Sequence, residues 1–459
     1  MPNKAASRTE YRVNHLSFFY AYWLRSGCAW YSPYHQIAFD LSTFSRKTTA
    51  HMMLDSGLVR QATELYAEKP QIFTRSAIGK LEHLRGNRDA AVQNLAAALS
   101  VNDPAEQQRA IKLLARLSPT DLISWSHRAG RLQTYHRLKA AIAPDPRASA
   151  ELADASADAH LLNANRKCSI GDKLQHLNRY WQEMGIQPIK QIHAAGLLDI
   201  NVLGEAVDND DQAASRMFAS VSVVMTVFNG ALYLRSALLS VLHQLDVETE
   251  VVVIDDASTD NSWNIICDVE RKFPCRIIAR RLTHNVGTYT AKNMGLALCS
   301  KEFVAFQDAD DWSHPERLKR AILWLRRKND NIAVTSRYVR MDPHGRFSSP
   351  WLWPLRQWSP NTLVMRRAPV LEAIGNFDNV RVGADTDYFE RIRANFGDRR
   401  ILFQKEVLLI AMHLPTSLMH SQHTGVNEFG YSEKRIAYRN LSAERLLLSA
   451  CGGNSRWVK

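Results

Sequence analysis

Three aspartates crowd the stretch AFQDADDW, which runs from Ala305 to Trp312. Asp308, Asp310 and Asp311 directly follow a short apolar run of the kind that forms a buried strand. Carboxylates in such a place lose hydration and repel one another, so as anions they need a cation or hydrogen-bond donors beside them. The stretch therefore predicts either a site for a metal ion and a phosphorylated ligand or an exposed, solvated turn.

The elements that must position these aspartates follow from the periodicity of the chain. From residue 220 onward, apolar runs typical of strands alternate with segments of helical periodicity. The predicted strands are VSVVMTVF, EVVVIDDAS, RIIARRL, EFVAFQD and NTLVMRR, and a predicted helix follows each of the first four. This order predicts an α/β fold with an open, mostly parallel sheet that is flanked by helices. Ligands of such sheets bind at the carboxyl ends of the strands.

Candidate binding residues, most of them polar, collect at those carboxyl ends. Besides the three aspartates after the fourth strand, they are Thr226, Phe228 and Asn229 after the first, Asp255 and Asp256 after the second, and Asn285, Gly287, Lys292 and Asn293 after the third. Acids from two strand ends therefore converge on one edge of the predicted sheet. This convergence favours a binding site over a solvated turn.

Five segments of this half resemble the motifs of family-2 glycosyltransferases with the GT-A fold. They are VSVVMTVFNGALYLRSALLSVLHQ, VVVIDDASTDNS, HNVGTYTAKNMGLA, FQDADDW and GADTDYFERI, and they occur in the family's order. The resemblance implies an inverting transferase whose donor is a nucleotide-diphosphate sugar, with UDP as the expected nucleotide. It also implies Mn²⁺ or Mg²⁺, which would neutralise the charge that grows on the departing diphosphate.

The resemblance also implies roles for the acids. Asp311 is expected to ligate the metal, and Asp310 to reach the ribose and the metal shell. Asp308 is expected to support the site from the strand face that it shares with Asp310. Asp256 resembles the acid that accepts a hydrogen bond from the uracil ring.

The remaining nucleotide-sugar-binding residues come from the first strand and the third loop. Thr226 and Phe228 resemble the residues that pack around the base, and Asn229 follows them in the same motif. Lys292 and Asn293 complete the set. Lys292 stands where the family more often has arginine, so the charge is kept but the bidentate fork is lost.

Asp385, in GADTDYFERI, resembles the general base of the family. Such a carboxylate takes the proton of the acceptor hydroxyl and typically contributes about 10²–10⁴-fold to the rate. The family usually has glutamate before this aspartate, whereas this chain has Ala384. The residue also precedes a predicted helix, 388–396, that is closed by Gly397. Capping of that helix by Asp385 or Asp387 is the alternative.

Two further groups are candidates for binding. His413, in LLIAMHLPTS, resembles a third metal ligand, with His420 and His423 as competitors. Exposed tryptophans stack on sugar rings, but tryptophans also pack in cores, and both interpretations apply to the three that lie near a Pro-rich insertion: Trp351, Trp353 and Trp358.

The first part of the chain differs from the second in its periodicity. Residues 1–207 are predicted to form an all-α helical domain, followed by a linker at 208–219, the GT-A domain at 220–425 and a helical extension at 426–459. One stretch weakly resembles a tetratricopeptide repeat, and an irregular helical domain is the alternative. Such repeats bind protein partners on a concave surface. The matching residues are Gly79, Gly86, Ala91, Leu95, Ala98 and Pro104.

Composition limits the remaining function classes. The 459 residues are 46% hydrophobic and 23% charged, and the formal charge is +12. The basic residues are spread out without a nucleic-acid-binding motif, so no nucleic acid partner is expected. The six cysteines form no C-x-x-C pair, which favours reduced thiols. With no apparent membrane span or signal peptide, we expect a cytoplasmic protein, and the charge would also suit peripheral association with the inner face of the cytoplasmic membrane.

The sequence therefore predicts an inverting glycosyltransferase for bacterial surface polysaccharide, either capsule or lipopolysaccharide, with a glycan or lipid-linked acceptor. It lacks the Q-x-x-R-W motif of processive synthases. The alternatives are a transferase-like binding protein without activity and a sugar nucleotidyltransferase. The second is disfavoured because FNGALYLRSAL is not the Gly-rich, basic segment that holds a triphosphate. A glycoside hydrolase, which needs two carboxylates about the bond, explains the motifs least.

Overall fold

The computed structural model describes residues 48–129, 157–167, 169–191, 200–201, 203–206, 219–349, 354–414, 417, 425–427 and 430–450. The chain divides into two compact units, one of residues 1–117, 386–400 and 418–459 and the other of residues 118–385 and 401–417. These units differ from the predicted domains, whose boundaries stay predictions. The predicted linker lies outside the described residues except for residue 219.

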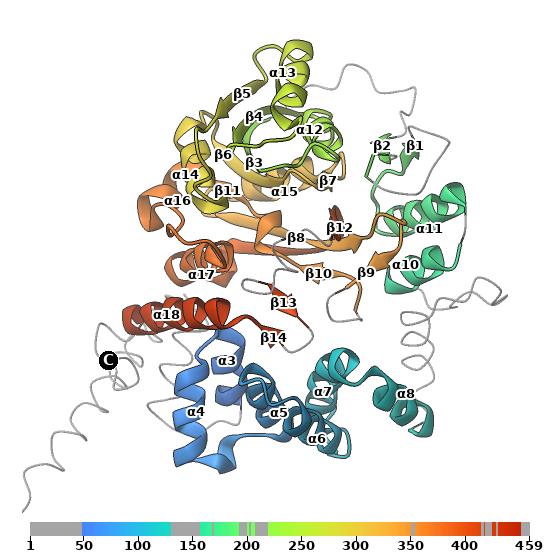
Figure 1. Ribbon diagram of the computed structural model, residues 1–459, viewed down its shortest axis with the longest axis vertical. Helices are drawn as coiled ribbons and strands as arrows, with labels where there is room; N and C mark the ends of the chain where they lie inside the picture. The colour runs from blue at the N-terminus through green and yellow to red at the C-terminus, as the bar shows by residue number, and fades with distance from the viewer. Residues whose placement is uncertain are drawn as a thin grey trace, which may run out of the picture. The chain divides into compact units, whose positions relative to one another are not determined.

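The first unit is helical. Its elements are α3 (Thr48–Ser56), α4 (Val59–Glu68), η1 (Pro70–Ile72), α5 (Arg75–Leu84), α6 (Arg88–Ala98), α7 (Pro104–Leu117), the part of α17 (Ala384–Phe396) from Thr386 onward, η3 (Asp398–Arg400), β13 (Val426–Asn427), β14 (Gly430–Tyr431) and α18 (Glu433–Ala450). Leu446 and Leu447 of α18 belong to the same apolar core as Leu54 and Leu65 of α3 and α4 (Figure 1). Helix α18 of the predicted helical extension therefore packs with the first helices that the structure describes.

Gly79 lets α5 and α6 approach closely. A Cβ atom at Gly79 would lie 2.5 Å from Cγ of Leu95, closer than any real side chain allows. Ala91 and Ala98 are buried on the same helix as Leu95. Gly79 and Leu95, two of the residues that suggested a repeat, thus meet at a helix–helix interface, while the relation to tetratricopeptide repeats stays a prediction.

The second unit contains the sheet. Its helices are α8 (Pro119–Arg128), α10 (Ala157–Asn165), α11 (Ile170–Glu183), α12 (Leu234–Leu242), α13 (Ser262–Lys272), α14 (Thr288–Leu298), α15 (Arg317–Arg327), α16 (Arg367–Ile374), the start of α17 and η2 (Pro360–Thr362). Its strands are β1 (Ile189–Gln191), β2 (Leu203–Ala206), β3 (Ala219–Val227), β4 (Val247–Asp255), β5 (Ile277–Arg281), β6 (Phe303–Asp308), β7 (Asp311–Ser313), β8 (Ala333–Met341), β9 (Phe347–Ser348), β10 (Gln357–Trp358), β11 (Val364–Arg366) and β12 (Ile401–Met412).

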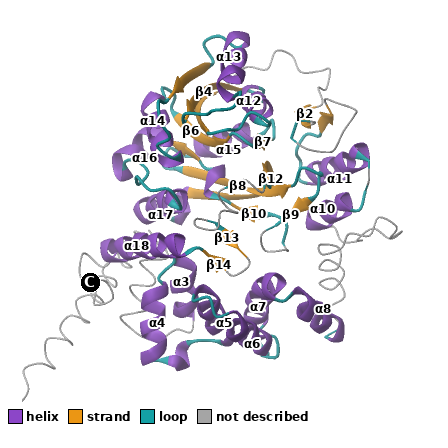
Figure 2. Ribbon diagram, viewed as in Figure 1, coloured by secondary structure: helices purple, strands orange, loops and turns teal. Residues whose placement is uncertain are grey.

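The large sheet has the order β5-β4-β3-β6-β11-β8-β12-β7. Its first four strands are parallel, as the alternation of strands and helices predicted. Beyond them the sheet is mixed, because β11 runs antiparallel to both β6 and β8, and β7 runs antiparallel to β12. The predicted α/β class with a mostly parallel sheet and flanking helices is confirmed (Figure 2), because the long strands β8 and β12 are parallel to each other and run in the same direction as β6. Short strands such as β7 and β11 carry too little periodicity to reveal their direction.

Helices cover both faces of the parallel half. On one face, apolar residues of α12, α13 and α15 pack with alternate residues of β3, β4 and β6. On the other face lies α14, where Gly295 allows a close approach. A Cβ atom at this glycine would lie 2.6 Å from Cγ1 of Val224 on β3. Helix α14 is therefore held directly against the strands that end at the candidate site.

Helices α10 and α11 lie within the range predicted to be an all-α domain, but they pack against the sheet. Trp181 of α11 is fully buried, and its indole Nε1 donates to the backbone oxygen of Val407 on β12 at 2.9 Å. Its ring centre lies 4.7 Å from that of His314 and 6.0 Å from that of Trp312. The range also contains strands β1 and β2, so it is not all-α. Helical periodicity shows that a segment is a helix but not which core the helix joins.

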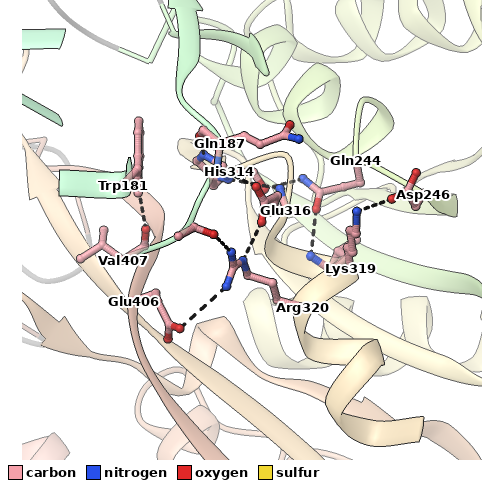
Figure 3. A network of polar contacts seen from close by, with 12 residues as sticks. Trp181, Gln187, Gln244, Asp246, His314, Glu316, Lys319, Arg320, Glu406 and Val407 are labelled. Atoms are coloured by element: carbon pink, nitrogen blue, oxygen red, sulfur yellow. Dashed lines mark hydrogen bonds and ion pairs between the residues drawn. The ribbon is translucent and has the colours of Figure 1, made fainter. Parts of the chain in front are cut away.

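A polar network continues this contact (Figure 3). Glu316, at the start of α15, accepts hydrogen bonds from the backbone N–H of Gln187 at 2.7 Å and from Arg320 at 2.6 Å. His314 bonds the backbone oxygen of Gln187 at 3.0 Å, and burial lowers the pKa of His314 to about 3. A neutral imidazole therefore joins the segment after α11 to the segment after β7. In the part of the chain that the structure describes, no helix is both long and apolar enough to cross a bilayer.

Candidate active site

The carboxyl ends of β3, β4 and β6 meet as the sequence predicted. Thr226 of β3 is in register with Ile254 of β4 on one side and with Asp308 of β6 on the other. Its hydroxyl group lies 3.0 Å from the hydroxyl of Thr288, the first residue of α14. The first strand, the acidic stretch and α14 therefore share one edge.

Asn229 joins the loop after β3 to the loop after β4. Its side-chain oxygen accepts a hydrogen bond from the backbone N–H of Thr259 at 2.8 Å, and its own N–H donates to Ser258 Oγ at 3.0 Å. Asn229 has φ 52°, a left-handed conformation that asparagine tolerates better than most residues. The neighbouring Phe228 is 53% exposed at this edge. The structure thus shows a structural use for Asn229 and an available ring at Phe228.

Asp256 anchors the loop that leads into α14. Its two carboxylate oxygens accept hydrogen bonds from the backbone N–H groups of Val286 at 2.7 Å and Gly287 at 2.8 Å. The side chain is buried, and Gly287 has φ 92°, where a side chain would be strained. Asp256 therefore fixes the start of α14, and its predicted contact with uracil stays a prediction.

Lys292 pairs with the acidic stretch from within the protein. It is only 3% exposed, and its Nζ lies 3.3 Å from Oδ1 of Asp308. The other oxygen of Asp308 accepts a hydrogen bond from Asn361 Nδ2 at 2.6 Å. Both oxygens of Asp308 are thus engaged, which agrees with a supporting role. Sequence reasoning missed Asn361, because no motif marks the loop after β10.

Residues 308–311, which we call the acidic turn, do not form one continuous strand. Strand β6 ends at Asp308, Asp310 lies in the turn, and β7 begins at Asp311. The predicted shared strand face of Asp308 and Asp310 is therefore wrong, because the alternation of side chains stops where the strand stops. The three side chains nevertheless interact through their charges.

Burial and neighbouring charge act together on this turn. Loss of hydration and the charge of Asp308 raise the pKa of Asp310 to about 6. Burial and the charges of Asp310 and Asp308 raise the pKa of Asp311 well above its usual range, against the opposing effect of Arg340. Two such carboxylates would be stabilised as anions by a divalent cation, and carboxylate oxygens are ligands that Mg²⁺ and Mn²⁺ prefer.

His413 lies beside the acidic turn. The N–H of Met412, the residue before it, donates to the backbone oxygen of Asp310 at 3.4 Å. Nδ1 of His413 lies 2.8 Å from Oγ of Ser348, a contact that would fix the ring orientation. The described residues contain no ready-made group of three or more His, Cys, Asp or Glu side chains for a metal. The carboxylate oxygens of the acidic turn are donors that would suit a hard cation, and the metal role of these residues stays a prediction.

Asp385 is connected to the candidate site by a hydrogen bond from a residue of α14. The hydroxyl of Tyr289 donates to Oδ1 of Asp385 and accepts from the N–H of Gly383, both at 3.1 Å. Asn293 holds the preceding loop, since its side chain exchanges two hydrogen bonds of 2.9 Å with the backbone of Phe377. In this structure Asn293 thus holds the loop before Asp385, and its predicted role in donor binding stays a prediction. Tyr289 was missed because it occupies an unmarked place within HNVGTYTAKNMGLA.

The helix after Asp385 begins earlier than predicted. Helix α17 starts at Ala384, so Asp385 lies in its first turn rather than before it. The predicted end is confirmed, because Gly397 follows the helix with φ 74°. A carboxylate in a first helical turn is stabilised by the helix dipole, so the capping alternative and the general-base hypothesis use the same position.

Of the remaining candidates, the structure describes Trp358 but not the other four. Trp358 on β10 donates from its indole nitrogen to Thr335 Oγ1 at 3.0 Å. His420, His423, Trp351 and Trp353 lie outside the described residues.

Comparison with known proteins bears on the same region. Residues 222–389 match the family model described as glycosyl transferase family 2. This segment belongs to glycosyl transferase family 2. The segment contains the carboxyl ends of β3, β4 and β6, the acidic turn and the candidate base Asp385.

The chain spans less than two thirds of the length of the curated relatives that it matches. An uncharacterized glycosyltransferase of Nostoc sp. is 39% identical over 102 residues, which is 22% of this chain and 31% of the relative. A UDP-Glc:alpha-D-GlcNAc-diphosphoundecaprenol beta-1,3-glucosyltransferase of Escherichia coli is 26% identical over 132 residues, 28% of this chain and 51% of the relative. Among solved structures, S. aureus TarS 1–349 in complex with UDP-GlcNAc aligns with TM-score 0.39 and 21% identity, over 50% of this chain and 71% of that chain.

Proposed function

We propose that the chain is an inverting glycosyltransferase. It would move a sugar from a nucleotide-diphosphate sugar, with UDP as the expected nucleotide, to a hydroxyl of a glycan or lipid-linked acceptor. One observation carries the proposal: contacts run from Asp385 to Tyr289 on α14, and from Lys292 on the same helix to Asp308 of the acidic turn. A candidate base and a candidate phosphate site are thus held by one rigid helix.

Asp385 is proposed as the general base. In a single displacement the acceptor hydroxyl attacks the anomeric carbon, and a carboxylate within hydrogen-bond reach takes its proton. Tyr289 would hold Oδ1 of this carboxylate and so fix the orientation in which it meets the acceptor hydroxyl. The displacement inverts the configuration at the anomeric carbon.

Asp310, Asp311 and His413 are proposed to hold Mn²⁺ or Mg²⁺. A bound divalent ion supplies neutralisation of the negative charge that grows on the departing diphosphate. The buried, mutually repelling carboxylates of the acidic turn support this proposal, because they would gain free energy from a cation. Thr226 and Phe228 would contact the nucleobase of the donor. Lys292 would act on the site indirectly, through its ion pair with Asp308.

The cellular setting is a further part of the proposal. The printed name of the Escherichia coli relative describes transfer from UDP-glucose to a sugar on diphosphoundecaprenol. This supports a lipid-linked acceptor and a role in surface polysaccharide synthesis for the present chain. The basic charge would suit work at the inner face of the cytoplasmic membrane, with the helical unit binding a protein partner.

A donor screen tests the proposal. The true donor among UDP-, GDP- and CMP-sugars with Mn²⁺ should raise the melting temperature, because a ligand of the folded state stabilises it by mass action. Asp311→Ala should abolish the metal-dependent part of nucleotide binding. Asp385→Asn should keep nucleotide binding and lose transfer.

Other outcomes would point elsewhere. Equal UDP affinity with and without Mn²⁺ in both the unmodified protein and Asp311→Ala would remove the metal role. Near-normal turnover of Asp385→Asn would remove the base. Donor binding without transfer to any acceptor would favour a transferase-like binding protein, and pyrophosphate release from a nucleoside triphosphate and a sugar phosphate would indicate a nucleotidyltransferase.

A further inference from the structure

One face of β8 carries polar side chains, two of which have an atom without a hydrogen-bond partner among the described residues. Because side chains alternate along a strand, Ser336, Tyr338 and Arg340 share this face, which we call the β8 wall. The opposite face carries Val339, which packs in the core that contains Trp181 of α11. The β8 wall therefore points away from α11.

Strand pairing brings the β8 wall to the acidic turn. Arg340 is in register with Ala411 of β12, and Ala411 is in register with Asp311 of β7. Strands β8 and β12 lie side by side in the sheet (Figure 1). In-register residues of neighbouring strands point to the same face, so Arg340 and Asp311 line one surface. The charge of Arg340 acts on both Asp310 and Asp311.

Two atoms of the β8 wall lack hydrogen-bond partners among the described residues. They are the hydroxyl oxygen of Ser336, a residue that is 2% exposed, and Nε of Arg340. The backbone of Ser336 is satisfied by Thr362, so only its side chain is unused. An unpaired buried polar group costs roughly 1–3 kcal/mol, and native proteins rarely keep two near each other without a reason. A ligand that supplies partners to both is a sufficient reason.

The spacing of these groups suits a sugar joined to a phosphate. The guanidinium of Arg340 lies over the ring of Tyr338, 5.6 Å from the ring centre. Residues two apart on a strand are separated by roughly 7 Å, so the charge over Tyr338 is about that far from Ser336. A guanidinium binds phosphate oxygens, whereas a hydroxyl binds a sugar hydroxyl.

We propose that the β8 wall binds the sugar-diphosphate part of the donor, with Arg340 on the diphosphate and Ser336 on a sugar hydroxyl. The inference rests on the proposed function and adds residues that no sequence motif marks. It makes Arg340 a fixed positive charge on the side of the diphosphate away from Lys292. It also makes Ser336 a determinant of which sugar is accepted.

Binding of UDP and of uridine, each with Mn²⁺, tests the role of Arg340, with GDP and guanosine measured in parallel. Arg340→Met should weaken diphosphate binding about tenfold to a hundredfold, since a charge-assisted hydrogen bond contributes about 1.5–3 kcal/mol. Nucleoside binding should be unchanged. Arg340→Lys, which keeps the charge, should recover most of the loss. Arg337→Met is the matched control, because Arg337 lies on the same strand but on its opposite face. This variant should bind UDP and uridine as the unmodified protein does.

Ser336→Ala provides an independent variant that removes a single oxygen atom. It should leave UDP binding unchanged and weaken binding of the sugar nucleotide severalfold. Equal losses for diphosphate and nucleoside in Arg340→Met, or no loss in either variant, would overturn the proposal. Failure of the unmodified protein to bind any nucleoside diphosphate would instead overturn the proposed function, so the two failures are distinguishable.

Discussion

The contact between Tyr289 and Asp385 leads to a quantitative prediction. Tyr289→Phe removes one oxygen atom, which donates to Asp385 Oδ1 and accepts from the N–H of Gly383, both at 3.1 Å. The ring should keep its place, because it stacks on Phe377 with ring centres 5.9 Å apart. Gly383 is partly exposed, so its N–H can bond to water instead. The change therefore acts mainly on the orientation of the Asp385 carboxylate.

The expected size follows from the bond that is lost. A hydrogen bond to a charged group contributes about 1.5–3 kcal/mol, and each 1.4 kcal/mol of barrier is about tenfold in rate. If the whole of this contribution holds the base in its reactive orientation, kcat should fall about tenfold to a hundredfold. Nucleotide affinity should change little, since the variant keeps the ring that lies beneath Lys292 Nζ, 6.0 Å from the ring centre, and loses only the hydroxyl.

The assay measures kcat and KM of donor turnover together with UDP affinity in titrations. Tyr66→Phe, a half-buried tyrosine of the helical unit, is the control and should change neither. In the double variant Tyr289→Phe/Asp385→Asn, the loss should equal that of Asp385→Asn alone, because the two groups act as a unit. Unchanged kcat in a folded Tyr289→Phe protein would refute the positioning role. Equal losses in kcat, UDP affinity and melting temperature would show a merely structural one.

Two further predictions concern stability. Gly295→Ala should destabilise the sheet-containing unit by about 1–3 kcal/mol and lower turnover, because its Cβ would lie 2.6 Å from Cγ1 of Val224 and push α14 outward; Gly171→Ala, on a helix with no atom within 4 Å, is the control in urea unfolding and should be neutral or stabilising. Burial lowers the pKa of His314 to about 3 from 6.5, so below pH 6.5 the unfolded chain binds a proton that the folded chain refuses. The contribution of His314 to the free energy of unfolding should therefore fall by about 2 kcal/mol between pH 7 and pH 5, and His314→Gln should remove this part of the pH dependence; identical pH dependence in the two proteins would contradict it.

The sequence by itself determined the α/β class and the edge at which the site lies. The strands from β3 to β6 are long, apolar and separated by helices of clear periodicity, so their parallel order follows from short right-handed connections. The carboxyl ends of parallel strands must lie at one edge, which is why Asp256, Asp308 and Thr226 could be grouped without a structure.

Tertiary structure decided what the grouped residues do. Asp256 and Asn229 occupy motif positions, yet their side-chain oxygens accept hydrogen bonds from the backbone of neighbouring loops. Without these bonds the backbone N–H groups would be unpaired. The direction of the short strands β7 and β11 was likewise set by their neighbours.

The least predictable residues are those brought in by pairing across long separations. Arg340 approaches Asp311 only because β8, β12 and β7 align in register, and Tyr289 meets Asp385 only because α14 packs on β3. No local pattern encodes such contacts, since they depend on which strand lies beside which. The sequence thus determined which chemistry the chain can carry at its sheet edge, and the packing of distant segments decided which side chains hold that chemistry in place.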